Sequence, residues 1–242
     1  MNRSPFLILE TGQPVASLRR YGRFPHWIRV AAGLDADETV VVDVEHGGEL
    51  PDHRDFAGVI ISGSAAYVTD RADWSERSAQ WLRTAAHDNR PVFGICYGHQ
   101  LLAHALGGEV GDNPTGREMG TVAVDLHPEA GGDALFGMLP ARFQVQVTHL
   151  QTVLRPPPEA AVLACSEQDR CQAFRWRDHA WGVQFHPEFS ATHMRGYVSA
   201  RRDALRGEGR CHRQLSRQIQ PTPLARGVLQ RFARHAARLR PH

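Results

Sequence analysis

The residue with the clearest chemical potential is a cysteine between two glycines, in the run Gly94-Ile95-Cys96-Tyr97-Gly98. A short apolar run ends at Ile95 and a helix-like segment follows, so Cys96 is expected on a tight strand-to-helix turn of the nucleophile-elbow kind. The free N–H groups and positive dipole end of that helix would favour the thiolate form of Cys96. A free cysteine is also often just a small buried apolar residue. The motif alone therefore leaves a nucleophile and a core cysteine both open.

A histidine and a glutamate stand two residues apart in His186-Pro187-Glu188, directly after another apolar run. In an extended chain this spacing puts both side chains on one face. The carboxylate could then hold one imidazole nitrogen while the other nitrogen faces a thiol, which is the arrangement of a nucleophile, a base and an orienting acid. The chain has 14 histidines, so an ordinary surface histidine is the competing interpretation of His186.

The two motifs together resemble those of the class I, triad-type glutamine amidotransferase family. They are Gly-Ile-Cys-Tyr-Gly-His-Gln at 94–100 and Gln-Phe-His-Pro-Glu-Phe at 184–189. The resemblance extends over residues 5–190 and is strongest to glutaminase domains of the GMP synthase type and their stand-alone bacterial relatives. It implies hydrolysis of the γ-amide of glutamine, with Cys96 as nucleophile, His186 as base and acid, and Glu188 as its orienting partner. It implies no metal or organic cofactor.

The same resemblance assigns an oxyanion hole and a substrate site. An Ile-Ser-Gly-Ser run that ends in Gly63 and Ser64 corresponds to a small-residue loop of the family. Backbone N–H groups of this loop and of Tyr97 would hold the oxyanion, because preorganised donors stabilise charge that develops in the transition state. The residues that the resemblance implies for the glutamine site are Gln100, Thr148, His149 and Leu150.

Structural and metal-binding interpretations compete at several of the other histidines and cysteines. His149 could be a structural histidine as readily as a substrate contact. Cys165, Cys171, Cys211 and His212 do not show the Cys-x₂₋₄-Cys spacing that is typical of zinc sites, so no metal site is expected. The four cysteines are unevenly placed and show no disulfide framework, which favours a reducing, cytoplasmic location.

Strand-like and helix-like segments alternate in the part of the chain that must position these residues. Short apolar runs predict strands at 6–9, 39–44, 59–61 and 91–95. Longer periodic segments predict helices at 24–32, 73–86 and 101–106. Five more strands are expected at 121–126, 143–147, 162–165, 172–176 and 180–185. The pattern predicts an α/β fold with a mainly parallel central sheet flanked by helices, in flavodoxin-like layers, extended by hairpins or mixed strands.

Charge divides the chain near residue 190. All 28 basic residues are Arg; residues 1–190 hold 16 of them against 24 acidic residues, and residues 191–242 hold 12 against two. We expect a glutaminase domain over 1–190 and an Arg-rich helical extension over 191–242 that packs on it. The extension lacks the interleaved aromatic residues of a single-strand binding platform, so no nucleic-acid partner is expected. No apolar run approaches the ~18–20 residues that span a bilayer, and no secretory signal is recognisable.

The sequence leaves the fate of the ammonia open. No ATP-pyrophosphatase phosphate loop is recognisable, and a chain without lysine cannot form a Gly-x-x-x-x-Gly-Lys loop. One hypothesis is a glutaminase subunit that supplies a separate synthase protein. A second is a stand-alone γ-glutamyl hydrolase or peptidase that acts on another γ-glutamyl compound. A third is a non-catalytic regulatory module, which the presence of all three triad residues disfavours.

Overall fold

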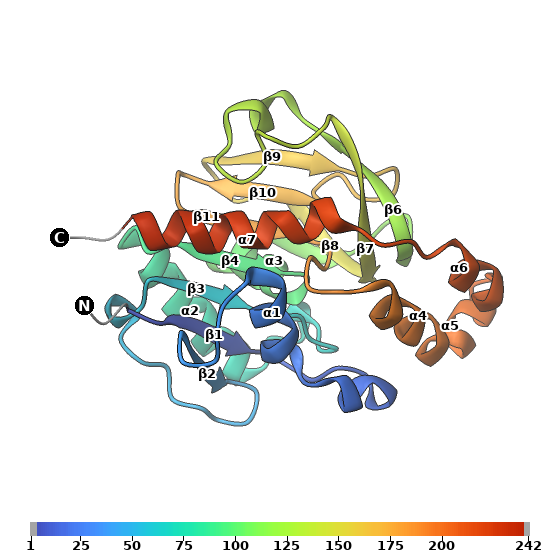
Figure 1. The fold of residues 1–242 in the computed structure, drawn as a ribbon, viewed down its shortest axis with the longest axis horizontal. Helices are drawn as coiled ribbons and strands as arrows, with labels where there is room; N and C mark the ends of the chain where they lie inside the picture. The colour runs from blue at the N-terminus through green and yellow to red at the C-terminus, as the bar shows by residue number, and fades with distance from the viewer. Residues whose placement is uncertain (1–3, 240–242) are drawn as a thin grey trace.

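The computed structural model describes residues 4–239, and in that range one large sheet of nine strands forms the centre of the molecule (Figure 1). Five adjacent strands are mutually parallel, in the order β2 (Thr39–Asp43), β1 (Phe6–Glu10), β3 (Gly58–Ile61), β4 (Val92–Ile95) and β11 (Ala180–Val183). The sheet continues antiparallel through β10 (Ala173–Trp176), β9 (Ala160–Cys165), β6 (Glu118–Leu126) and β7 (Arg142–His149). A separate ribbon pairs β5 (Glu109–Asp112) with β8 (Gln151–Arg155).

Helices cover both faces of the parallel part of the sheet. Contacts between α1 (Phe24–Ala32) and α7 (Pro223–Arg238) form one layer, and contacts between α2 (Asp73–His87) and α3 (Tyr97–Ala105) form the other. Three shorter helices, α4 (Ala191–Ala200), α5 (Arg202–Gly207) and α6 (His212–Gln218), gather beyond one end of α7 (Figure 1). Short 3₁₀ helices occur at Ala16–Tyr21, His53–Asp55, Val68–Asp70 and Pro128–Gly132.

The strand residues divide the core into two apolar clusters, one on each face of the sheet. In β1, Phe6 and Ile8 pack on the side of α1 and α7, while Leu7 and Leu9 pack on the side of α2 and α3. This division follows from the two-residue repeat of a strand, and it explains why the central parallel strands are apolar at nearly every position. The predicted fold class, a mainly parallel sheet flanked by helices, is confirmed.

The predicted elements differ from the observed ones at α3, β5 and β8. Helix α3 begins at Tyr97, four residues before the predicted start, because the turn at Cys96 leads directly into it. The ribbon strands β5 and β8 were not predicted at all. Both strands are short and have no strong local pattern. They are stabilised by pairing with each other, although the two segments are far apart in the sequence.

Helix α7 belongs to the same apolar core as the sheet. Its Phe232 ring lies edge-on to Phe6 and Trp181 and is tilted against Phe93, with centroids 6.4, 6.1 and 5.1 Å away. The C-terminal residues thus complete one of the two helical layers (Figure 1). Among the residues that the structure describes, no helix combines the length and the apolar character that crossing a membrane requires.

Candidate active site

The predicted site residues lie where neighbouring parallel strands end. Strand β4 ends at Ile95, directly before Cys96, and its partner β11 ends at Val183, three residues before His186. On the other side of β4, strand β3 ends at Ile61 and leads into the loop with Gly63 and Ser64. The carboxyl ends of parallel strands are the common place for ligand sites in α/β proteins. Register alone therefore brings together three segments that are far apart in the sequence.

Cys96 occupies a strained turn between β4 and α3. Its φ is +52°, a left-handed value that is unusual for a residue with a side chain. The tight turn needs its two flanking glycines: a Cβ on Gly94 would overlap the backbone of Gly98, and a Cβ on Gly98 would lie 2.6 Å from the carbonyl oxygen of Ile61. Such strain is commonly found at functional positions. The observed turn has the geometry that the sequence motif predicted.

His186 and Glu188 form a buried pair beside the cysteine. The imidazole Nδ1 donates to Glu188 Oε1 at 2.8 Å, and the two side chains are 3% and 0% exposed. Burial alone would lower the pKa of His186, but the nearby side chains of Glu188 and Cys96 outweigh this and raise the pKa to about 10. The other ring nitrogen, Nε2, has no hydrogen-bond partner among the described residues. One nitrogen is therefore held, and the other is available to a substrate.

An aromatic ring that the sequence reasoning passed over supports His186. Phe189 stacks on the imidazole with a centroid distance of 4.0 Å and an angle of 20° between planes. Tyr197 from α4 stacks in turn on Phe189, with the ring centroids 4.9 Å apart. A ring face placed against an imidazolium favours its positive charge. Phe189 was quoted as part of the second motif, so its sequence signal was present, but only the fold shows what it contacts.

The loop of Gly63 lies against both predicted catalytic side chains. A Cβ on Gly63 would lie 3.1 Å from Cε1 of His186 and 3.8 Å from Cβ of Cys96. Thr11, which follows β1, braces this loop: its hydroxyl donates to the carbonyl oxygen of Ser62 at 3.0 Å, and its N–H donates to Ser62 Oγ at 3.0 Å. The sequence reasoning missed Thr11 because nothing local distinguishes a threonine that makes distant hydrogen bonds.

A narrow cavity extends from Cys96 toward the predicted substrate residues. Seven of the predicted site residues line it: Ser64, Cys96, Tyr97, Gln100, Thr148, His149 and Leu150. The side-chain nitrogen Nε2 of Gln100 donates to the carbonyl oxygen of Gln151 at 2.8 Å and to Gln184 Oε1 at 2.9 Å. Gln100 therefore ties the cavity wall to the start of β8. The side chain of Tyr97 points elsewhere, since its hydroxyl lies 2.6 Å from Ser75 Oγ, so only its backbone can serve the site.

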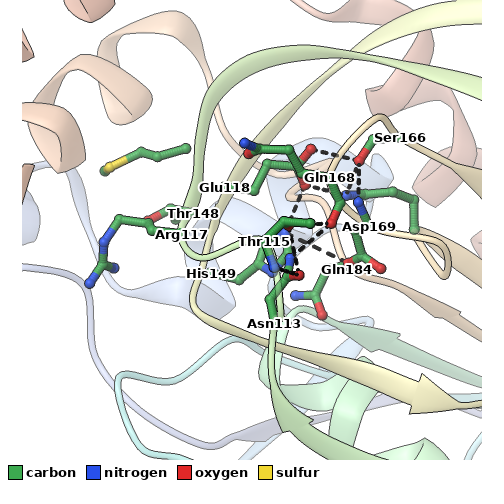
Figure 2. A network of polar contacts seen from close by, with 12 residues as sticks. Asn113, Thr115, Arg117, Glu118, Thr148, His149, Ser166, Gln168, Asp169 and Gln184 are labelled. Carbon is green, nitrogen blue, oxygen red and sulfur yellow. Dashed lines mark hydrogen bonds and ion pairs between the residues drawn. The ribbon is translucent and has the colours of Figure 1, made fainter. Parts of the chain in front are cut away.

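The side chain of His149 belongs to a buried polar network behind the cavity (Figure 2). Its Nε2 lies 2.9 Å from Glu118 Oε2 and its Nδ1 lies 3.0 Å from the carbonyl oxygen of Gln151. Both ring nitrogens therefore face oxygen atoms of the protein. Ser166 donates to the other oxygen of Glu118 at 2.6 Å. His149 thus supports the segment that lines the cavity, with its two ring nitrogens on Glu118 and on the carbonyl oxygen of Gln151.

This network also contains the one group of three metal-ligand side chains found in residues 4–239, formed by Glu118, His149 and Asp169. In the structure these side chains contact one another, since Nε2 of His149 lies 2.9 Å from Glu118 Oε2 and 3.8 Å from Asp169 Oδ2. None of the free cysteines Cys165, Cys171 and Cys211 contributes to the group. The three side chains act as an internal support for β6 and β7.

Comparison with known proteins agrees with this geometry. Residues 30–202 match the family model described as glutamine amidotransferase class-I. The chain belongs to this family.

Relatives of the class I glutamine amidotransferase chain include enzymes with two different names. A subunit of GMP synthase (glutamine-hydrolyzing) from Ignicoccus hospitalis is 37% identical over 143 residues, which is 59% of this chain and 72% of the relative. Gamma-glutamyl peptidase 3 from Arabidopsis thaliana is 33% identical over 152 residues, and GMP synthase (glutamine-hydrolyzing) from Aeropyrum pernix is 40% identical over 136. The last two matches span 59% and 56% of this chain, but only 60% and 25% of those relatives.

Solved structures share the fold of this class I chain. A glutamine amidotransferase from Thermotoga maritima superposes with a TM-score of 0.78 at 20% identity, covering 98% of this chain and 100% of that one. A glutamine amido transferase from Methylobacillus flagellatus superposes with a TM-score of 0.75 at 24% identity, covering 98% and 93%. The similarity includes the C-terminal helices, so the arrangement of nearly the whole chain is common to these proteins.

Proposed function

We propose that this protein hydrolyses the γ-amide of glutamine through a γ-glutamyl thioester on Cys96. The observation that carries the proposal is the juxtaposition at the strand ends. A strained cysteine heads helix α3, and a buried His186–Glu188 pair lies beside it with one imidazole nitrogen open. Cysteine, an adjacent base and an orienting carboxylate are the parts that nucleophilic amide hydrolysis requires.

The first half of the reaction forms the thioester. The thiolate of Cys96 attacks the γ-carbonyl carbon, and the negative charge that develops on the oxygen is held by the N–H groups of Tyr97 and Gly63. Removing one donor of such a pair typically costs a few kcal/mol of transition-state stabilisation, roughly 3–4. His186, which the carboxylate of Glu188 keeps protonated against the opposing effect of burial, donates its Nε2 proton to the departing nitrogen. The C–N bond breaks and ammonia leaves.

The second half of the reaction releases glutamate. His186 is now neutral and takes a proton from a water molecule, which attacks the thioester carbon. The C–S bond breaks, Cys96 returns to its thiolate form and His186 is again an imidazolium. Glu188 holds the imidazole in one orientation through the 2.8 Å bond to Nδ1. The balance of the reaction is glutamine and water to glutamate and ammonia.

The test is release of glutamate and ammonia from glutamine by the purified protein. Cys96→Ala should abolish turnover, and Cys211→Ala, at an exposed cysteine, is the matched control that should leave it unchanged. Acid quenching during turnover, followed by mass spectrometry, should find a γ-glutamyl adduct on the peptide that contains Cys96. Turnover that survives Cys96→Ala would refute the proposed mechanism.

A second candidate substrate class is a γ-glutamyl peptide, and a cavity beside His186 favours it. The cavity measures about 310 Å³ and is lined by Cys96 and His186 together with residues of the first 3₁₀ helix and of α4. Ammonia needs far less room, since one water molecule takes about 30 Å³ in the liquid. A panel of glutamine and γ-glutamyl peptides distinguishes the two substrate classes.

The partner of a glutaminase would be a protein that consumes ammonia. Two relatives, from Ignicoccus hospitalis and Methanococcoides burtonii, are named as a subunit of GMP synthase. We propose, by similarity, that ammonia from this chain can reach a synthase on a separate polypeptide. A glutaminase rate that rises several-fold when an ammonia-dependent synthase of the same cell is added would support this, and an unchanged rate would count against that synthase as a partner.

A further inference from the structure

The cavity on the His186 side must receive the group that leaves. His186 Nε2 has to lie within hydrogen-bond reach of the departing nitrogen in order to protonate it. His186 lines this cavity and is absent from the lining of the narrow cavity that holds Gln100 and Leu150. Cys96 lines both. The scissile bond therefore lies between the two cavities, with the glutamyl part on the Gln100 side and the amine part on the His186 side.

Two arginines line the amine-side cavity, and no acidic residue does. Arg19 comes from the 3₁₀ helix Ala16–Tyr21, and its Nε donates to the carbonyl oxygen of Pro14 at 3.2 Å. Arg201 comes from the junction of α4 and α5 and lines the glutamyl-side cavity as well. Within residues 4–239, neither guanidinium has a carboxylate within salt-bridge distance, whereas the adjacent Arg202 has Asp203 at 3.8 Å. The positive charge of this cavity is not neutralised by the protein.

Arg201 is the less solvated of the two arginines. Its Nε is buried and, among the described residues, has no hydrogen-bond partner. A buried guanidinium donor without an acceptor is costly, and a carboxylate satisfies it well because the two planar groups match in geometry. Arg117, which lines the glutamyl-side cavity, differs in that its Nε already donates to Glu208 at 2.8 Å. Of the two arginines without a carboxylate, Arg19 lines the amine-side cavity alone, and Arg201 lies where the two cavities meet and lines both.

We propose that the amine-side cavity binds the amine half of a γ-glutamyl compound, and that Arg19 and Arg201 select amine halves that carry a carboxylate, such as an amino acid or a dipeptide. The proposal rests on the proposed function, since it uses the same Cys96 and His186. Cys96 sulfur bonds to the γ-carbonyl carbon, the C–N bond breaks, and the amine leaves with the proton of His186. Water then cleaves the thioester, so that the products are glutamate and a free amino acid or dipeptide.

The experiment compares γ-glutamylalanine with γ-glutamylalaninamide, which differ only in the carboxylate, and includes glutamine as the third substrate. The wild-type protein should hydrolyse the acid with a kcat/KM at least about tenfold above the amide, the size of one charge-assisted hydrogen bond. Arg201→Gln and Arg19→Gln should each bring this ratio toward one. The matched controls are Arg202→Gln and Arg20→Gln, neighbours that line neither cavity and should leave the ratio as in the wild type.

The ratio is measured within each variant, so a partial loss of folded protein does not change it. Equal rates for acid and amide in the wild type would overturn the inference. So would an Arg201→Gln variant that loses the same factor on all three substrates, because Arg201 would then bind the α-carboxylate of the glutamyl part. Turnover of glutamine alone, dependent on Cys96, would overturn this inference and leave the proposed function standing. Absence of Cys96-dependent turnover of all three substrates would overturn both.

Discussion

The structure contains two buried histidine–carboxylate pairs that differ in their surroundings. His186 and Glu188 are joined at 2.8 Å, and His149 and Glu118 at 2.9 Å. All four side chains are at most 3% exposed. The pairs differ in what the second imidazole nitrogen meets. In His149 it meets the carbonyl oxygen of Gln151, and in His186 it has no partner among the described residues.

The difference shows that a buried histidine–carboxylate pair is not by itself a sign of catalysis. An imidazole held by acceptors on both sides cannot exchange a proton without losing a hydrogen bond, so it serves as a rigid link. An imidazole held on one side keeps a nitrogen available for proton transfer. The first arrangement supports the wall of the substrate cavity, and the second lies next to the predicted nucleophile. The same substitution at both histidines separates these roles.

The largest effect is expected from His186→Gln. A glutamine amide can still donate an N–H to Glu188, but it cannot carry a proton to the leaving nitrogen. We expect kcat/KM for glutamine to fall at least about 10³-fold, as for loss of one member of a catalytic triad. Chemical denaturation should show that His186→Gln lowers the free energy of unfolding by less than His149→Gln does. Retention of more than a tenth of the activity would argue against His186 as the general acid.

Glu188→Gln should reduce kcat by about 10² to 10⁴, since a triad without its orienting carboxylate loses the favoured imidazole orientation. Glu188 also raises the pKa of His186, so the alkaline limb of the kcat profile should move to lower pH in the variant. His186 must be protonated to donate, and the variant loses that proton earlier as pH rises. An alkaline limb that stays in place would show that another group titrates there.

The raised pKa of His186 has a consequence for stability. The folded state, with a pKa of about 10, binds this proton more tightly than the unfolded chain, with a pKa of about 6.5. The resulting stabilisation is full below pH 6.5 and disappears as pH rises through 10. Denaturation between these two pH values should therefore show a steeper loss of stability in the wild type than in Glu188→Gln.

His149→Gln should act on stability first. A glutamine side chain carries its donor hydrogens on one terminal nitrogen, so it cannot replace both ring nitrogens, and the contact with Glu118 or with the carbonyl oxygen of Gln151 is lost. Such a loss typically costs about 1–3 kcal/mol, more where a charge is involved. Urea denaturation measures it, with His186→Gln as the matched comparison. A variant with unchanged stability and more than a thousandfold loss of activity would give His149 a chemical role and end the distinction between the two pairs.

The smallest effect is expected from Thr11→Val, which removes hydrogen bonds between uncharged groups that hold the Gly63 loop. The valine keeps the shape but leaves the hydroxyl's contacts with Ser62 unmade, for a cost of about 1 kcal/mol. The turnover number should fall a few-fold through a less well ordered loop, with little change in KM. Thr39→Val, on the edge strand β2, is the control and should leave kcat unchanged.

Much of the fold was accessible from local patterns, for physical reasons that differ by element. Strands β1, β3 and β4 are continuous apolar runs, as buried parallel strands must be, and each was predicted within a residue or two. Strands β5 and β8 escaped prediction because Glu109–Asp112 has no alternating pattern and is ordered by its partner alone. The start of α3 was not predicted correctly because the turn at Cys96 depends on a strained backbone conformation and on close backbone packing.

The sequence by itself determined which residues can do the chemistry. Cysteine between two glycines at a strand end, and histidine two residues before glutamate, offer a candidate nucleophile, base and orienting acid through local geometry and residue type. Only the tertiary structure decided which of the two histidine–carboxylate pairs keeps an unpartnered nitrogen, that Thr11 hydrogen-bonds to the Gly63 loop, and that Arg201 lines the same cavities as Cys96. Those outcomes depend on burial and on partners many residues away, which pair through long-range packing that no local spacing encodes.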